Sequence, residues 1–253
     1  MKTIKLLSFI LLFALAFSCS KDDDGPSQSD NDNTPVVSLN AQSASGFGYK
    51  VFFQETASPQ TRKGLVILAH GDNSDEADGT LNSQCEALAK KGYVAVTTSY
   101  RNPTGTYEEI NARFKGDIES MITAMGGEFQ IPRNKTIIGG LSRGGNNTFP
   151  LILPGQPGVG NPITDIRGAI LECSGGDEWK GSAVLVPVAY MANKVDPTMG
   201  VENANDFKNG LLNNANGSVA QDSECLIINS SGHCTSSGQY KNFVVEKVME
   251  WLP

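Results

Sequence analysis

Short apolar runs alternate along the chain with stretches whose apolar residues recur at helical spacing. The predicted strands are 48–54, 64–69, 93–100, the β-branched run that leads to Gly140, 167–173, 184–191 and 225–229. The predicted helices are 81–91, 107–125, a helix after Ser142 that stops near Pro150 or Pro154, 203–212 and 240–252. Strands that are apolar on both faces and alternate with helices are typical of a parallel sheet covered on both sides. The pattern therefore predicts an α/β domain.

One of the predicted strands contains a proline. Because proline has no backbone N–H to donate to a neighbouring strand, the strand 184–191 either tolerates Pro187 near its start or begins only after it. The last predicted helix closes the core, and four of its apolar residues should point inward: Val244, Val245, Val248 and Trp251.

The chain begins with a charged start followed by an apolar run, which is typical of a signal peptide. Lys2 and Lys5 precede the nearly continuous apolar run 6–17, which is short for a membrane span. Small residues then lead to Cys19, and this junction resembles a bacterial lipoprotein signal in which the cysteine becomes the lipidated N-terminus. The alternative is an ordinary signal peptide with an incidental cysteine. We expect residues 1–18 to be the signal peptide and Cys19 to anchor the protein to a membrane.

Residues 19–34 are rich in Ser, Asp, Asn, Gln, Gly and Pro, and they offer nothing to bury. This composition predicts a disordered acidic tether. The segment Ser20-Lys21-Asp22-Asp23-Asp24 resembles the acidic export tag of surface lipoproteins in the Bacteroidetes, although plain spacers can also be acidic. We therefore expect an outer membrane lipoprotein, at the cell surface or in the periplasm, whose single folded domain spans 35–253.

The charge balance narrows the possible partners. The whole chain carries a formal net charge of −7, and about −5 remains on the domain once signal peptide and tether are set aside. An acidic domain without a basic stripe has no electrostatic footprint for nucleic acid, so we expect no nucleic-acid partner. We also expect the domain to be a monomer.

The segment Gly140-Leu141-Ser142-Arg143-Gly144 has the pattern G-x-S-x-G and lies between a predicted strand and a predicted helix. A serine in such a sharp strand-to-helix turn is exposed at the carboxyl edge of the sheet, where its hydroxyl can attack a substrate. Glycine fits at Gly140 and Gly144 because neighbouring backbone crowds the turn. Ser142 is therefore the candidate nucleophile.

A nucleophilic serine needs a base, and the chain contains only two histidines. His233 follows the strand 225–229 and is the candidate base, whereas His70 follows an earlier strand and should have another role. Asp196 follows the strand 184–191 and is the candidate carboxylate that orients the base. The order Ser142, Asp196, His233 along the chain matches this kind of site. Three other carboxylates remain candidates for the orienting role: Asp177, Glu178 and Glu172.

Acyl transfer also requires backbone N–H groups that stabilise the oxyanion of the tetrahedral intermediate. We expect the N–H of Arg143, at the start of the helix, and that of Asp72, after His70-Gly71, to do so. One such donor is typically worth about 2.7–4 kcal/mol in the transition state. The carboxylate of Asp72 would oppose an oxyanion, so it must point away, or else a neighbour such as Asn73 is the donor.

These motifs resemble the α/β-hydrolase superfamily, and within it a compact dienelactone-hydrolase-like, polyester esterase-like or feruloyl esterase-like member. The resemblance covers about 48–251. It implies a mostly parallel eight-stranded sheet with helices on both faces, no cofactor and no metal. Ser142 departs from the cysteine nucleophile of true dienelactone hydrolases, and Arg143 differs from the Met or Gln often found at that position. The particular branch therefore stays open.

Four cysteines remain after Cys19, and an even number suits an oxidising compartment. Of the three possible pairings we favour Cys173 with Cys234, which would brace the His233 loop, and Cys85 and Cys225 are then either bonded or free. The cysteine spacings do not suit zinc. The acidic segment 72–79 lacks the spaced ligands of a calcium loop.

Two aromatic residues at or beyond strand ends, Tyr100 and Trp179, are candidate walls of a substrate pocket. Trp179 could equally close the core under a loop, and a tyrosine placed like Tyr100 is more often a core residue than a pocket residue. Together these features predict a serine hydrolase of carboxylic esters, possible substrates being acetyl or aromatic esters attached to polysaccharides. A lipase, thioesterase or peptidase would use the same residues. A glycan-binding surface lipoprotein that lost its chemistry is the alternative outside enzymes.

Overall fold

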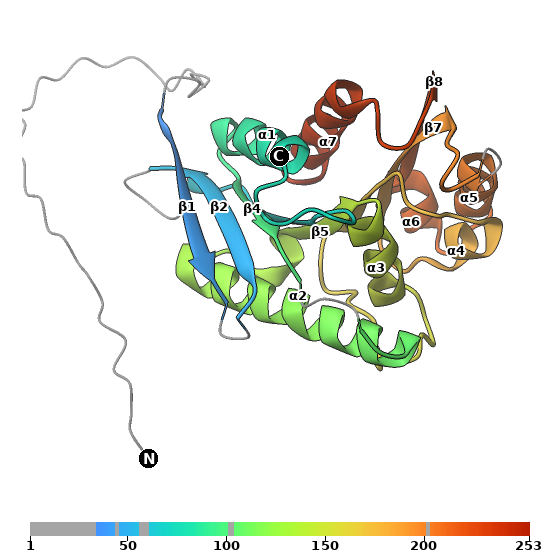
Figure 1. Ribbon diagram of the computed structural model, residues 1–253, viewed down its shortest axis with the longest axis horizontal. Helices are drawn as coiled ribbons and strands as arrows, with labels where there is room; N and C mark the ends of the chain where they lie inside the picture. Colours follow the sequence, from blue (N-terminus) through green and yellow to red (C-terminus); the bar gives the residue numbers. More distant parts are fainter. Residues whose placement is uncertain (1–33, 44–45, 56–60, 101–103, 201–202) are drawn as a thin grey trace, which may run out of the picture. The chain divides into compact units, whose positions relative to one another are not determined.

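Eight strands and seven helices make up the fold in the computed structural model, which describes residues 34–43, 46–55, 61–100, 104–200 and 203–253 (Figure 1). The strands are β1 (Val36–Gln42), β2 (Gly48–Gln54), β3 (Leu65–Ala69), β4 (Val94–Thr98), β5 (Thr136–Leu141), β6 (Gly168–Glu172), β7 (Val188–Val195) and β8 (Glu224–Ser231). The helices are α1 (Gly79–Lys90), α2 (Tyr107–Phe129), α3 (Arg143–Ile152), α4 (Glu178–Ala183), α5 (Asn203–Leu212), α6 (Gly217–Asp222) and α7 (Ser237–Trp251). A 3-10 turn, η2 (Arg133–Lys135), leads into β5.

All eight strands form one sheet in the order β1-β2-β4-β3-β5-β6-β7-β8. The pairs β1–β2 and β2–β4 are antiparallel, whereas every pair from β4 to β8 is parallel. The mostly parallel eight-stranded sheet expected from the sequence is therefore confirmed. Because the parallel strands end at the same edge, the segments that follow β3, β5, β6, β7 and β8 all meet there.

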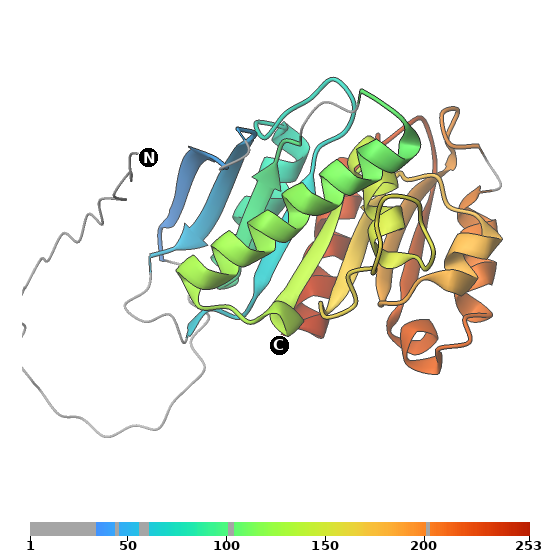
Figure 2. The same ribbon diagram turned by 90° about the horizontal axis from the view of Figure 1, so that it is seen from below.

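Helices cover both faces of the sheet, as predicted. Successive strand residues point to opposite faces, so in β3 Leu65 and Ile67 pack on one side, and Val66 and Leu68 on the other. The helices α1 and α7 lie on the side of Val66, and α2, α3, α5 and α6 contribute to the core on the opposite side. Figures 1 and 2 show α1 and α7 on the face opposite the long helix α2.

The bounds of several elements match the sequence predictions, and local chemistry explains those that shift. α5 spans the predicted residues, and β7 begins directly after Pro187. α1 begins at Gly79, earlier than predicted, because the carboxylate of Asp78 accepts hydrogen bonds from the first N–H groups of the helix. α2 continues past its expected end through Gly126 and Gly127, and it stops where Gln130 takes the left-handed conformation.

Three elements had no clear signal in the sequence. β1 was missed because five of its seven residues are exposed, and an edge strand with polar residues at alternate positions resembles a loop. α4 and α6 have only six residues each, which is too short for helical periodicity to be recognised. The inward direction predicted for Val244, Val248 and Trp251 in α7 is confirmed, and Val245 is partly buried against the same cluster.

No helix in the described ranges is both long enough and apolar enough to span a membrane. The predicted signal peptide, Cys19 and nearly all of the predicted tether lie outside the residues that the structure describes.

Candidate active site

Ser142 occupies the sharp turn between β5 and α3. Its backbone angles are φ 53° and ψ −111°, a conformation that is costly for a residue with a side chain. Neighbouring segments hold it there, because the N–H of Ser142 donates to the carbonyl of Glu172 at 2.7 Å and its own carbonyl accepts from Asn146 N at 2.9 Å. Strain stored at one serine, and held by the surrounding backbone, is typical of a functional turn.

The glycines on either side of Ser142 have no room for a side chain. A Cβ added at Gly140 would lie 2.5 Å from the carbonyl oxygen of Ala69, and one at Gly144 would overlap the same oxygen. The strand β3 therefore packs directly against the turn. This contact brings the segment after β3, with His70 and Gly71, beside Ser142.

The side chains of Ser142, His233 and Asp196 form one hydrogen-bonded chain. The Ser142 Oγ lies 2.7 Å from Nε2 of His233, and Nδ1 of His233 lies 2.8 Å from Oδ2 of Asp196. The carboxylate of Asp196 is buried, and its other oxygen accepts from the backbone N–H groups of Thr198 and Met199 at 2.9 and 3.1 Å. A carboxylate held in this way fixes the tautomer of the histidine, so that Nε2 faces the serine hydroxyl as an acceptor.

The other carboxylates considered for the orienting role are engaged elsewhere. Asp177 caps α4 by accepting from Lys180 N at 2.8 Å, and Glu178 lies in the first turn of the same helix. The Glu172 carboxyl is fully buried and accepts from Nε2 of Gln84 at 2.7 Å. Of the four candidates, Asp196 is the one hydrogen-bonded to His233.

The segment after β3 contacts the serine turn from the other side. A Cβ at Gly71 would lie 3.4 Å from the Cβ of Ser142, which shows how closely the two segments approach. The carboxylate of Asp72 forms an ion pair with the guanidinium of Arg143. The Asp72 carboxylate is thus directed at a cation on α3 and is partly neutralised there, which weakens its repulsion of an oxyanion.

His70, the first residue of this segment, stacks on the ring of Tyr100. Their ring centroids are 4.5 Å apart with an interplanar angle of 14°, and the Tyr100 hydroxyl donates to the carbonyl of His70 at 3.2 Å. Burial, together with the charge of Asp72, raises the pKa of Tyr100 to about 12. Tyr100 therefore supports the backbone beside Ser142. Trp179 lies on α4 with 54% of its surface exposed and takes no part in the hydrogen-bonded chain.

A disulfide joins Cys173, directly after β6, to Cys234, the residue after His233. This pairing was favoured from the sequence, and it ties the histidine loop to the strand whose last carbonyl holds Ser142. Both cysteines have positive φ angles, 46° and 54°, which shows how tightly the backbone turns at each end. Cys85 and Cys225 are free, and they pack on opposite faces of the sheet, so they cannot pair.

Two asparagines of the site have no motif in the sequence. Asn146, one turn after Ser142, accepts from Gly175 N at 2.7 Å, and its Nδ2 lies 4.0 Å from the sulfur of Met199. It thereby joins the segments that follow β5, β6 and β7. Asn193 is a buried polar residue in the otherwise apolar part of β7 and contacts the histidine loop. In the sequence, the signal that could point to it is an asparagine at the end of an apolar run, three positions before the candidate Asp196.

The buried Glu172 is the most perturbed carboxyl of the site. Burial raises its pKa to about 8 against the opposing effect of the hydrogen bond from Gln84. Its second oxygen, Oε1, has no hydrogen-bond partner among the described residues, and neither has Oε1 of Gln84. An ionised carboxylate in this position would be costly, so the group is neutral over most of the acidic and neutral range.

Within the described part of the chain, no three His, Cys, Asp or Glu side chains are grouped so as to hold a metal ion. The acidic segment 72–79 uses its carboxylates locally: Asp72 pairs with Arg143, Asp75 accepts from Ala77 N, and Asp78 caps α1. The structure therefore gives no support for the calcium loop considered above.

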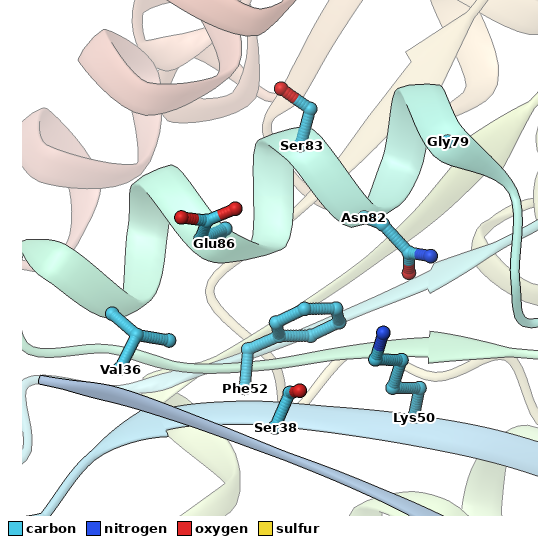
Figure 3. A pocket seen from close by; sticks show the side chains of 8 residues that line it. All are labelled: Val36, Ser38, Lys50, Phe52, Gly79, Asn82, Ser83 and Glu86. Carbon is cyan, nitrogen blue, oxygen red and sulfur yellow. The ribbon is translucent and has the colours of Figure 1, made fainter.

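A separate cavity of about 440 Å³ lies between α1 and the strands β1 and β2 (Figure 3). Its lining is mixed, with Lys50 and Glu86 facing it beside Phe52, Asn82 and Ser83. None of the residues of the hydrogen-bonded chain lines it. This cavity is distinct from the site at Ser142.

Comparison of the sequence with protein-family models gives no match. Comparison with curated proteins gives none either. Solved structures do resemble the chain. A candidate dienelactone hydrolase from Klebsiella pneumoniae has a TM-score of 0.64 at 10% identity, covering 86% of this chain and 98% of its own. The esterase Pf2001 of Pyrococcus furiosus has a TM-score of 0.62 at 13% identity, covering 90% and 97%.

A third similar structure is a serine-to-alanine mutant of the feruloyl esterase module from Clostridium thermocellum, complexed with sinapinate. Its TM-score is 0.61 at 12% identity, and the match covers 88% of this chain and 92% of the module. Identities this low establish the architecture alone. With its strand order and its serine turn after β5, the protein has the α/β-hydrolase fold.

Proposed function

We propose that the protein is a serine hydrolase that cleaves carboxylic esters through an acyl-enzyme. The observation that carries this proposal is the hydrogen-bonded chain from the strained Ser142 through His233 to the buried Asp196. A serine held in a costly conformation at 2.7 Å from a histidine, which a carboxylate orients in turn, is the arrangement of an activated nucleophile.

In the first half of the reaction, Ser142 Oγ attacks the ester carbonyl carbon while His233 Nε2 takes the serine proton. The resulting oxyanion is stabilised by the backbone N–H groups of Arg143 and Asp72. When the tetrahedral intermediate collapses, the bond to the alcohol oxygen breaks and His233 returns the proton to that oxygen. Ser142 then carries the acyl group, and Asp196 has stabilised the transient imidazolium.

In the second half, water attacks the acyl carbon while His233 takes one of its protons. Collapse of the second intermediate releases the carboxylic acid and gives the proton back to Ser142. The disulfide at Cys234 and the asparagine at 193 hold the histidine loop, so that one imidazole can serve both halves in the same position.

Ester cleavage is favoured over the other reactions of such a site by the structural resemblance. Two of the similar structures are an esterase and a feruloyl esterase module. Lipases, thioesterases and peptidases could use the same three residues, because all of them transfer an acyl group to the serine. A catalytically inactive glycan-binding protein would have no need for the strained Ser142.

For the natural substrates we propose acetyl or aromatic esters attached to polysaccharides. The exposed indole of Trp179 offers an apolar surface on which a sugar or phenyl ring could stack. Tyr100 contributes to the pocket mainly through His70, on which it stacks. A Trp179→Ala variant should raise KM for an aromatic ester such as methyl ferulate more than for p-nitrophenyl acetate. Equal effects on the two esters would remove Trp179 from the pocket.

We further propose that Cys19 is lipidated and that the protein is a monomeric outer membrane lipoprotein, at the cell surface or in the periplasm. The support is the sequence around Cys19, with its apolar run before and acidic tether after. Cells expressing the wild type should incorporate labelled palmitate into the protein, and the Cys19→Ala variant should not. Labelling of the variant would contradict this part of the proposal.

The direct test of the reaction uses p-nitrophenyl acetate and butyrate with the wild type, Ser142→Ala and Ser218→Ala. Ser218 is an exposed serine at the start of α6 and serves as the matched control. Wild type and Ser218→Ala should turn over equally, whereas Ser142→Ala should lose activity. A folded wild type that turns over no ester would contradict the esterase proposal and favour the glycan-binding alternative.

A further inference from the structure

Asn193 has a buried side-chain amide whose four hydrogen bonds all go to the histidine loop or to the start of α7. Its Nδ2 donates to the carbonyl of Gly232 and to Oγ1 of Thr235, both at 2.8 Å. Its Oδ1 accepts from Oγ of Ser236 at 2.8 Å and from the hydroxyl of Tyr240 at 3.0 Å. Because a carbonyl can only accept, the atom facing Gly232 must be the NH₂ group, which fixes the orientation of the amide.

The partners of Asn193 are themselves bonded in a consistent direction. Thr235 Oγ1 accepts a hydrogen bond from Asn193, and its own hydroxyl donates to the carbonyl of Ser231 at 3.0 Å. Ser236 Oγ donates to Asn193 and lies 2.9 Å from Ser230 Oγ, which can donate to it in turn. Every donor and acceptor of the amide is therefore satisfied. A fully satisfied buried polar group specifies one local structure, whereas a partly satisfied one does not.

The contacts of Asn193 lie on both sides of His233. Gly232 immediately precedes the histidine and takes a left-handed conformation, with φ 104°, while Thr235 follows it by two residues. The N–H of Gly232 also donates to the carbonyl of Val195 at 2.8 Å. The end of β7 is therefore hydrogen-bonded to the histidine loop on both sides of His233.

The same strand end carries Asp196, three residues after Asn193. The pairing of β7 with β8 is irregular between Asn193 and Val195, and such a bulge redirects the side chains next to it. One strand end thus presents a carboxylate to Nδ1 of His233 and an amide to the backbone around it.

We propose that Asn193 is a positioning residue that holds His233 in line between Ser142 and Asp196. The inference rests on the proposed function, because it assigns Asn193 a part in the same reaction. Asn193 acts through the loop backbone rather than on the reacting atoms. Replacing its NH₂ group with a carboxylate oxygen would place that oxygen against the carbonyl of Gly232. Two acceptors cannot hydrogen-bond to each other, so the loop would no longer be held there. A displacement of about 1 Å at a reacting group costs on the order of 10²-fold in rate.

The test compares Asn193→Asp with Asn214→Asp in the full-length protein. Asn214 is the matched control because it is also a buried asparagine whose amide bonds backbone groups, namely the carbonyls of Gly181 and Val184 and the N–H of Asn216. Both variants should lower Tm. Only Asn193→Asp should lower kcat, on the order of 10²-fold with KM little changed. It should also broaden or shift the downfield proton NMR resonance of His233 Nδ1–H.

A folded Asn193→Asp protein with wild-type kcat and an unaltered resonance would overturn the proposal, as would an equal loss of kcat in Asn214→Asp. If Asn193→Asp does not fold, Tyr240→Phe decides, because it removes only the hydroxyl that donates to Asn193. A smaller loss of kcat in that variant supports the proposal, and an unchanged kcat overturns it. Failure of the proposed function can be told apart from failure of this inference. In the first case the wild type itself is inactive, and the NMR resonance of the wild type and its variants still reports the His233–Asp196 contact.

Discussion

The backbone N–H of Ser142 donates a 2.7 Å hydrogen bond to the carbonyl of Glu172, a residue whose own carboxyl is fully buried beside Gln84. The strained serine turn is therefore anchored to the last residue of β6, and the next residue, Cys173, carries the disulfide to the histidine loop. One strand end supports both the serine and the histidine of the site. Its stability should therefore matter to activity as well as to folding.

The buried carboxyl of Glu172 should make the protein progressively less stable as the pH rises from 4.5 to about 8. Below pH 4.5, the ordinary pKa, the group is protonated in both states and makes the stability no more or less dependent on pH. Between there and its folded pKa of about 8, the unfolded chain releases the proton and the folded protein keeps it. The free energy of unfolding should then fall with rising pH, by at most about 1.4 kcal/mol per pH unit from this group.

Glu172→Gln should remove this contribution, because a neutral amide replaces the carboxyl and can still accept from Gln84. Urea denaturation of wild type and variant from pH 4.5 to 8 would measure it. The variant should gain stability relative to the wild type as pH rises. Parallel stability curves for the two proteins would show that Glu172 is not held neutral in the folded state.

Reduction of the Cys173–Cys234 disulfide should destabilise the protein and slow the reaction. The two cysteines are 61 residues apart, and the chain entropy released by opening such a loop corresponds to on the order of 4 kcal/mol. A phosphine reductant should lower both Tm and kcat of the wild type. The double variant Cys173→Ala/Cys234→Ala should already have the lower values and should not respond further. An equal response of both proteins would assign the effect to other groups.

Asp196→Asn should reduce kcat by on the order of 10⁴-fold, as in serine proteases with the same arrangement, while KM changes little. The amide cannot stabilise the imidazolium and favours the wrong tautomer of His233. Asp177→Asn is the control, because Asp177 caps α4 and was the rival candidate for this role. Steady-state kinetics on p-nitrophenyl butyrate would separate the two. A larger loss in Asp177→Asn would transfer the role to that residue.

Two glycine-to-alanine substitutions should have opposite effects on stability. A Cβ at Gly144 would overlap backbone atoms of Ala69 and His70, so Gly144→Ala should lower stability by at least about 1–3 kcal/mol and impair activity. A Cβ at Gly127 in α2 meets nothing within 4 Å, so Gly127→Ala should raise stability by about 0.5–1 kcal/mol. Thermal denaturation would measure both. Destabilisation by Gly127→Ala would contradict the packing described for α2.

The parts of this fold that could be predicted from the sequence are those with a strong local pattern. β3 is apolar at all five positions and α5 has clear helical spacing, so both were recognised. The sequence also placed Ser142, Asp196 and His233 at strand ends of one sheet, and the structure joins them in one hydrogen-bonded chain. This was possible because parallel strands bring distant segments to a common edge and because only two histidines were available.

The remaining features depend on contacts that no local pattern encodes. The ion pair of Asp72 with Arg143 joins two segments far apart in the sequence, and so does the hydrogen bond from Asn193 to Gly232. Asn146 and Gly175 meet only because β5 and β6 are neighbours in the sheet. Single polar residues of this kind acquire a role from the fold.

The central claim, that Ser142 is an activated nucleophile, is tested most directly by covalent labelling. The wild type and the variants Ser142→Ala and His233→Gln would be treated with a fluorophosphonate probe, and the labelled peptide identified by mass spectrometry. We predict one adduct, on Ser142, absent in Ser142→Ala and formed far more slowly in His233→Gln. Equal labelling of Ser142→Ala, or a folded wild type that takes no label, would contradict the account.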